Sequence, residues 1–98
     1  MMRSGNMPYT IEYKDSVLKK DIPALSNTAR KHIKKAIETR LCVDPIMLGK
    51  PLRFGLSGQR SLRVGDYRII YVVDAPKNIV TITNLGHRKD VYERALLR

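Results

Sequence analysis

Arginines on two neighbouring segments are the residues of this sequence best suited to chemistry. The run LRVGDYRIIYVV, residues 62–73, reads as two strands joined by a two-residue turn of Gly65 and Asp66, and glycine in first place suits a type II′ turn. That turn would set Arg63 directly opposite Arg68, and like charges opposed in this way destabilise a sheet. The opposite face of the hairpin is apolar and supplies a core. We therefore expect an anionic ligand to dock on the face that carries the two arginines.

A second basic cluster, Gly86-His87-Arg88-Lys89, follows the next predicted strand and is expected to converge on the same face. Arginine presents a planar fork suited to phosphate oxygens, and the ordinary pKa of histidine lies near neutral pH, so His87 is the natural proton carrier. Each residue also has a purely structural alternative. Arg68 could form an ion pair with a carboxylate, His87 could only end the strand, and Tyr92 could only anchor the last helix. The candidate catalytic residues are Arg68, His87, Arg88 and Tyr92, and the candidate phosphate-binding residues are Lys50, Arg53, Arg60, Arg63 and Lys89.

Composition limits the class of protein. Ninety-eight residues make one domain, 1–98, in which residues 1–6 are expected to be disordered. Nineteen Lys and Arg against nine Asp and Glu give a net charge of +10, which predicts nucleic acid, an acidic protein or a membrane surface as partner. No apolar run is long enough to cross a membrane or direct secretion, so we expect a cytoplasmic protein. A single cysteine, Cys42, excludes an internal disulfide, and with two histidines far apart in the sequence it argues against a structural zinc site.

The elements that position these residues follow from turn signals and hydrophobic periodicity. They predict an α+β fold of two layers, in which antiparallel strands carry two helices on one face. A capping box of Asp90 and Glu93 would begin the last helix, and Ser26 or Asn27 would begin the longest one. The predicted elements are a strand at 9–13, a short helix from 15 to 22, a helix from 27 to about 41, a loop at 44–56, strands at 60–64, 67–73 and 79–85, and a final helix through 97.

The runs LRVGDYRIIYVVD and LGHRKDVYERAL resemble the RelE/ParE toxin superfamily, and specifically its RelE branch in type II toxin–antitoxin systems. The GDYRIIY part is shared across the superfamily and indicates a small two-layer RelE-like fold. The GHRKDVY part is typical of ribosome-dependent messenger-RNA interferases. The resemblance implies an endoribonuclease that cuts the codon in the ribosomal A site, by attack of the 2′-hydroxyl on the adjacent phosphate. It implies no metal and no cofactor.

The resemblance also assigns roles to the candidate residues. Arg68 matches an arginine that stabilises the transition-state phosphate, with Arg63 nearby, and Arg88 matches a basic residue that assists the leaving group. Tyr92 matches a tyrosine that orients the substrate, and His87 stands where some branches place a catalytic histidine.

One departure leaves the general base open. Two lysines of the best-known member correspond here to Gln59 and Ser61. His87 is the expected replacement, with Arg60 or Lys50 as alternatives.

Two other functions remain open from the sequence. A ParE-type protein would poison DNA gyrase without cutting RNA, and a generic basic module would only bind nucleic acid. For a toxin, the expected partners are the ribosome with its message and a RelB-like antitoxin, whose acidic and apolar C-terminal segment would cover the arginine face. Ile70 and Val72 lie on that face and would receive the segment if the last helix is displaced.

Overall fold

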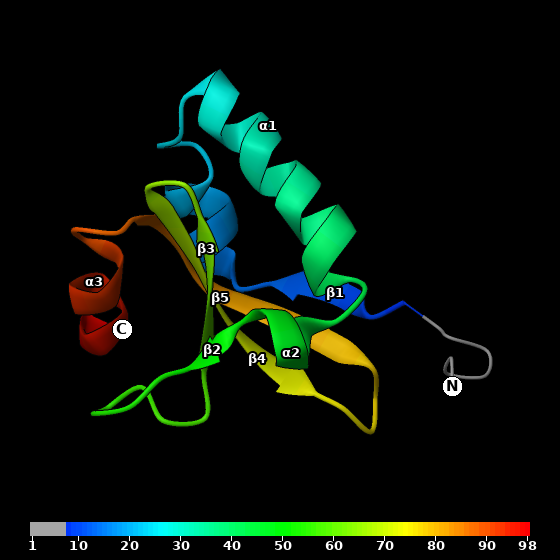
Figure 1. Cartoon of the computed structure of the whole chain (residues 1–98). Coiled ribbons are helices and arrows are strands. Elements are labelled where there is room, and N and C mark those ends of the chain that lie inside the picture. Colours follow the sequence, from blue (N-terminus) through cyan, green and yellow to red (C-terminus); the bar gives the residue numbers. More distant parts are fainter. Residues whose placement is uncertain (1–7) are drawn as a thin grey trace.

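The computed structural model describes residues 8–98, so the disorder expected for residues 1–6 lies outside the described residues. Its elements confirm the predicted α+β class, with one helical layer on a five-stranded sheet and a short helix on the other side (Figure 1). In chain order they are β1 (Thr10–Tyr13), η1 (Val17–Asp21), α1 (Asn27–Ala36), η2 (Ile37–Leu41), α2 (Pro45–Leu48), β2 (Lys50–Pro51), β3 (Arg60–Val64), β4 (Tyr67–Asp74), β5 (Ile79–His87) and α3 (Val91–Leu97).

The sheet has the strand order β1-β5-β4-β3-β2. The N-terminal strand β1 runs parallel to β5, with Thr10 beside Ile79, whereas all the other neighbours are antiparallel. The first and the last strand of the described chain therefore pair with each other, and β1 forms one edge of the sheet.

The β3–β4 hairpin has the predicted register. Arg63 lies opposite Arg68, and Leu62 lies opposite Ile69. Of the two turn residues, Gly65 alone has a positive φ, +58°, which is the pattern of a type II′ turn. The structure therefore confirms the prediction that two arginines lie directly opposite each other.

The main core lies between the sheet and the helical layer of η1, α1 and η2. Apolar residues at helical spacing along α1 and η2 meet the alternate residues of β3, β4 and β5 that point the same way. Ser26 caps α1 by accepting a hydrogen bond from the backbone N–H of Ala29, as predicted. The fully buried members of this core are Val17, Leu41, Ile69, Tyr71, Val80, Ile82 and Leu85.

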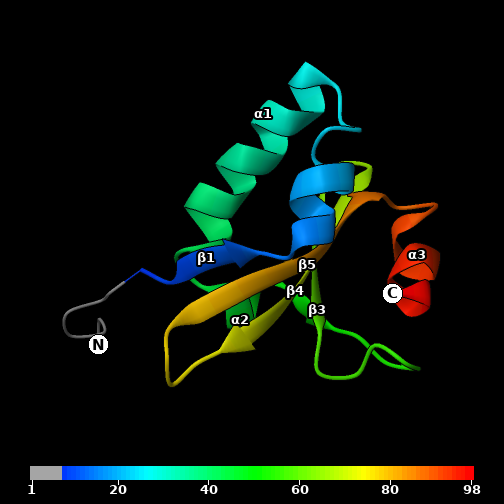
Figure 2. The same ribbon diagram turned by 180° about the vertical axis from the view of Figure 1, so that it is seen from behind.

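A smaller apolar cluster lies on the opposite face of the sheet, beneath α3. Ile70 of β4 contacts Val91 and Ala95 of α3 and Leu56 of the β2–β3 loop. We call this side of the sheet the α3 face. Seen from behind, α3 lies beside the end of β5, far from α1 (Figure 2).

A buried carboxylate holds the end of α3 to η1. Asp21, whose side chain is 1% exposed, accepts two hydrogen bonds from the guanidinium of Arg98, at 2.8 and 2.9 Å, and one from the backbone N–H of Leu85. Hydrogen bonding to Asp21 raises the pKa of Arg98, and burial opposes the rise. Arg94 adds a hydrogen bond to the Leu85 carbonyl. This network was not predicted, although Asp21 lies one turn after buried Val17 and so shares its face.

Two local predictions need correction, and one feature of the sheet was not predicted. Asp90 precedes α3 but makes no side-chain capping hydrogen bond, so the capping box is wrong. The predicted loop at 44–56 contains α2 and β2, because Asp44 caps α2 through the N–H of Met47 and Pro45 occupies its first turn. A β-bulge lies in the β4–β5 pairing, where Ile70 faces Asn84 but Tyr71 faces Ile82. The extra residue, Thr83, reverses the alternation of faces along β5.

Candidate functional site

Four polar side chains share the α3 face because the strand registers align them. Lys50 of β2 lies opposite Ser61 of β3, and Arg63, two residues along, lies opposite Arg68 of β4. Gly86 of β5 continues the second row, opposite Arg68. Three strands thus place two arginines and a lysine on one face. We call Lys50, Ser61, Arg63 and Arg68 the basic seat.

Arg68 is half-buried, and the carbonyls of the hairpin turn hold its side chain. Its Nη1 donates to the carbonyl oxygens of Gly65 and Tyr67, both at 2.9 Å. No ion pair joins Arg68 to a carboxylate among residues 8–98. Since a guanidinium has five N–H groups, donors remain for an anion.

Arg88 reaches the same turn from the end of β5. Its backbone N–H donates to the Asp66 carbonyl at 2.8 Å, and its Nε lies 3.7 Å from the Asp66 carboxylate. Both side chains are more than half exposed, and such a surface pair contributes only about 0–1 kcal/mol. The backbone therefore positions Arg88, while its guanidinium can exchange Asp66 for another anion.

Tyr92 joins α3 to the basic seat. Its hydroxyl lies 2.9 Å from the Ser61 hydroxyl. The neighbouring Gln59 accepts a hydrogen bond of 2.6 Å from Thr83. Neither Ser61 nor Gln59 can serve as a charged base, so these two positions hold the site together by neutral hydrogen bonds.

His87 lies on the other face of the sheet, contrary to the expectation that it joins the arginines. It is opposite Tyr67, whose ring packs against the main core, and the two rings meet edge to face with centroids 5.7 Å apart. Its Nδ1 accepts from the backbone N–H of Lys89 at 3.2 Å. The β5 bulge accounts for this orientation, because strict alternation after Ile82 would have put His87 on the face of Arg68.

Arg60 also lies away from the basic seat. It is opposite the buried Tyr71 on the core side, and its guanidinium donates to the carbonyls of Ile46 and Gly49. Burial raises the pKa of the Tyr71 hydroxyl, which donates to the Pro45 carbonyl at 2.6 Å. Arg60 therefore supports α2, and we leave it out of the site.

The remaining predicted cations lie at the margin. Arg53 is exposed in the β2–β3 loop, and Lys89 is exposed immediately after β5. Neither residue pairs with a residue of the basic seat in the sheet. Each could contact an extended ligand, but neither is held at the seat itself.

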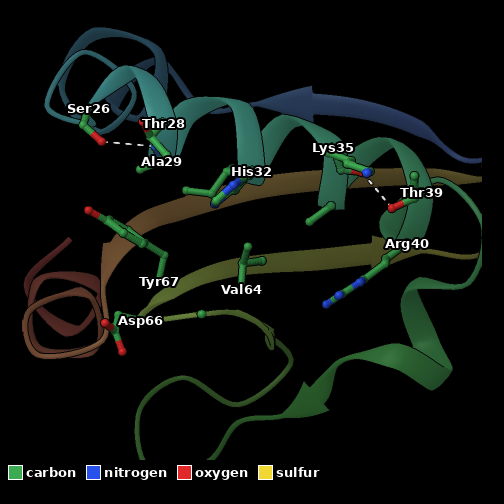
Figure 3. Close-up of a pocket in the computed structure, with 13 residues that line it drawn as sticks. Ser26, Thr28, Ala29, His32, Lys35, Thr39, Arg40, Val64, Asp66 and Tyr67 are labelled. Atoms are coloured by element: carbon green, nitrogen blue, oxygen red, sulfur yellow. Dashed lines mark hydrogen bonds between the residues drawn. The ribbon is translucent and has the colours of Figure 1, made fainter.

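A groove lies on the opposite side of the sheet from the arginines. It has a volume of about 530 Å³ and lies between α1 and the tip of the β3–β4 hairpin. Figure 3 shows His32 and Arg40 of the helical layer directed toward Tyr67 and Val64 across this groove. The candidate site lies on the α3 face instead, because Arg63 is opposite Arg68 there and the Tyr92 hydroxyl contacts Ser61. Cys42 is not suited to act as a nucleophile, because burial and the neighbouring Glu38 raise the pKa of its thiol.

The fold and the basic seat together define a small basic α+β protein of the RelE type. The chain belongs to the RelE/ParE toxin superfamily of type II toxin–antitoxin systems: the family described as "ParE toxin of type II toxin-antitoxin system, parDE" matches residues 11–92. Toxin RelG of Mycobacterium tuberculosis is 33% identical over 88 residues, which are 90% of this chain and 100% of that protein. Toxin RelE of the same organism is 43% identical over 49 residues, half of each chain.

Solved structures of toxins have the same fold. The toxin–antitoxin complex RelBE2 from Mycobacterium tuberculosis matches with a TM-score of 0.78 and 31% identity, over 86% of this chain and 95% of that one. A free mutant of the Escherichia coli toxin RelE matches with a TM-score of 0.69 and 26% identity, over 94% and 98% of the two chains. Within residues 8–98, no helix is long and apolar enough to cross a membrane.

Proposed function

We propose that this toxin is a ribosome-dependent endoribonuclease that cuts messenger RNA in the ribosomal A site. The observation that carries the proposal is the basic seat, in which Arg63, Arg68 and Lys50 share one sheet face with the Tyr92 hydroxyl. In this reaction the 2′-oxygen of the message forms a bond to the adjacent phosphorus, and the bond from phosphorus to the 5′-oxygen breaks. The products are a 2′,3′-cyclic phosphate and a 5′-hydroxyl, so the 2′-hydroxyl loses the proton and the leaving oxygen gains one.

The cations would act by stabilising charge. Arg68, fixed by the turn carbonyls, donates to the phosphate oxygens on which negative charge grows, and Arg63 and Lys50 flank it. Arg88 lies at the end of β5 to assist the leaving group, and Tyr92 orients the substrate. Because His87 and Arg60 are on the other face, Lys50 is the one alternative base from the sequence that remains on the face of the seat.

Incubation of the purified toxin with ribosomes and a defined message tests this function. The expected product is a single cut in the A-site codon with a cyclic phosphate at the new 3′ end, mapped by primer extension and end-group analysis. The same message without ribosomes should remain intact. An intact message on ribosomes would contradict the proposal.

A gyrase inhibitor is the second candidate, because the matching family description names ParE. It would act by binding, and its cells would show DNA damage with messages intact. A supercoiling assay with purified gyrase separates the two functions: inhibition of gyrase without RNA cleavage would establish this alternative.

The proposed partner in the cytoplasm is a RelB-like antitoxin, since several similar structures are complexes with such proteins. Ile70 is fully buried under α3, whereas Val72 on the same face is partly exposed. An acidic and apolar segment would replace α3 on Ile70 and cover Arg68 and Arg88. Hydrogen exchange of the complex should show α3 deprotected and the β4 amides protected. A complex in which α3 stays protected and both arginines remain accessible would refute this binding mode.

A further inference from the structure

We propose that Phe54 is a stacking platform for an unpaired RNA base at the rim of the basic seat. The inference rests on the proposed function and extends it, because it names the part of the RNA, a nucleobase, that this surface recognises. Aromatic side chains beside basic grooves bind single-stranded RNA by stacking, since every base has a π face.

The side chain of Phe54 is unusually placed. It is the one phenylalanine of the sequence, it is 89% exposed, and its backbone has φ +54°, a left-handed conformation that a bulky residue rarely adopts. The aromatic ring is therefore exposed to solvent on a residue whose backbone conformation is strained, and such strain concentrates at binding sites.

The loop that carries Phe54 is well braced. The N–H of Leu52 donates to the Gln59 carbonyl, and the N–H of Leu56 donates to the Arg53 carbonyl. Leu56 is buried against α3, and a Cβ on the adjacent Gly55 would lie 2.8 Å from Leu96 of that helix. An ordered loop therefore presents the ring, so little entropy is lost when a base stacks on it. In Figures 1 and 2 this loop projects beside the end of α3.

The charge around Phe54 favours RNA as the occupant. Residues 45–65 contain no Asp or Glu, whereas Lys50, Arg53 and Arg63 are all exposed along this segment. Leu52 and Leu56 turn the loop toward the α3 face, where the basic seat lies. A phosphate in the seat would place the next bases of the strand toward this loop, and the ring would receive one of them.

A fluorescence experiment tests the platform directly, because the sequence contains no tryptophan. Phe54→Trp introduces a single reporter, and Met47→Trp, on α2 and 78% exposed, is the matched control. A short oligoadenylate should quench the emission of Phe54→Trp, while abasic RNA of the same length should not, and Met47→Trp should respond to neither. Equal quenching of the two variants, or none at RNA concentrations where binding is measured by anisotropy, would overturn the platform. The platform would also be overturned if the emission of Phe54→Trp changed on addition of the antitoxin but not on addition of RNA.

Cleavage assays then separate the platform from the nuclease itself. Phe54→Gly removes the ring and relieves the strained φ, so folding should persist. It should lower kcat/KM on ribosome-bound message by about 5- to 150-fold, mainly through KM, while Phe54→Tyr should retain activity. Quenching of Phe54→Trp on ribosomes with and without an A-site codon distinguishes a message base from a ribosomal RNA base. If the wild-type protein cleaves the message and Phe54→Gly cleaves it equally well, the platform is refuted but the nuclease is not. If RNA quenches Phe54→Trp but no cleavage is found, the nuclease is refuted but the platform is not.

Discussion

Replacing Arg68 and Arg88 together by alanine should abolish message cleavage and growth arrest. Loss of one preorganised donor to transition-state charge costs on the order of 10²- to 10³-fold in rate, so loss of both should cost about 10⁴-fold or more. Neither guanidinium supports the core: Arg68 bonds only turn carbonyls, and Arg88 has an exposed pairing with Asp66. Single-turnover cleavage on ribosomes measures the effect, and circular dichroism should show an unchanged fold.

Lys31→Ala combined with Lys34→Ala is the matched control, because it removes two positive charges from the exposed side of α1. This control should weaken RNA attraction only through the overall field and should leave the rate within about a factor of ten. An active double arginine variant, or an equal loss in the lysine control, would show that the basic seat does not carry the catalysis.

Replacing Asp21 by alanine should have the largest effect on stability. The change leaves the Leu85 N–H without its acceptor and leaves Arg98 only the Asn84 amide oxygen, and an unsatisfied buried donor costs about 1–3 kcal/mol. Because a domain is stable by only about 5–15 kcal/mol in all, the loss would be a large fraction of the total. Urea denaturation followed by circular dichroism measures the free energy of unfolding.

Asp15→Ala provides the comparison, because Asp15 is an exposed carboxylate just before η1. It should change the free energy of unfolding by no more than about 0.5 kcal/mol. Asp21→Asn should fall between the two, since the amide oxygen can still accept from Leu85 while the charge is lost. A change below about 1 kcal/mol for Asp21→Ala would mean that desolvation of the pair offsets its attraction.

The sequence predicted those parts of the fold that local chemistry decides. The Gly65 turn fixes the β3–β4 register, and with it the opposed arginines, because a two-residue loop leaves no freedom to slip. The Ser26 cap and the spacing of apolar residues in α1 were equally readable. The family resemblance indicated a toxin of a type II toxin–antitoxin system, and the similarity to known toxins confirms this class.

The site was less predictable, because its geometry depends on non-local features. One extra residue in β5 decides the face of His87, and nothing in the run around Thr83 marks a bulge. Arg60 is different: its register opposite Tyr71 already indicated the core side, and only the short α2 that receives its hydrogen bonds was hidden. Lys50 could be aligned with Ser61 only once β2 was known.

The pairing of β1 with β5 determines when the molecule can first function. During synthesis β1 and the helical layer are made before Ile79–His87, so at first they lack the strand that joins β1 to the rest of the sheet. Contacts between segments so distant in sequence form late in folding. The nascent chain therefore cannot complete its fold before β5 is made, and until then it exposes apolar surface to any chaperone that arrives first.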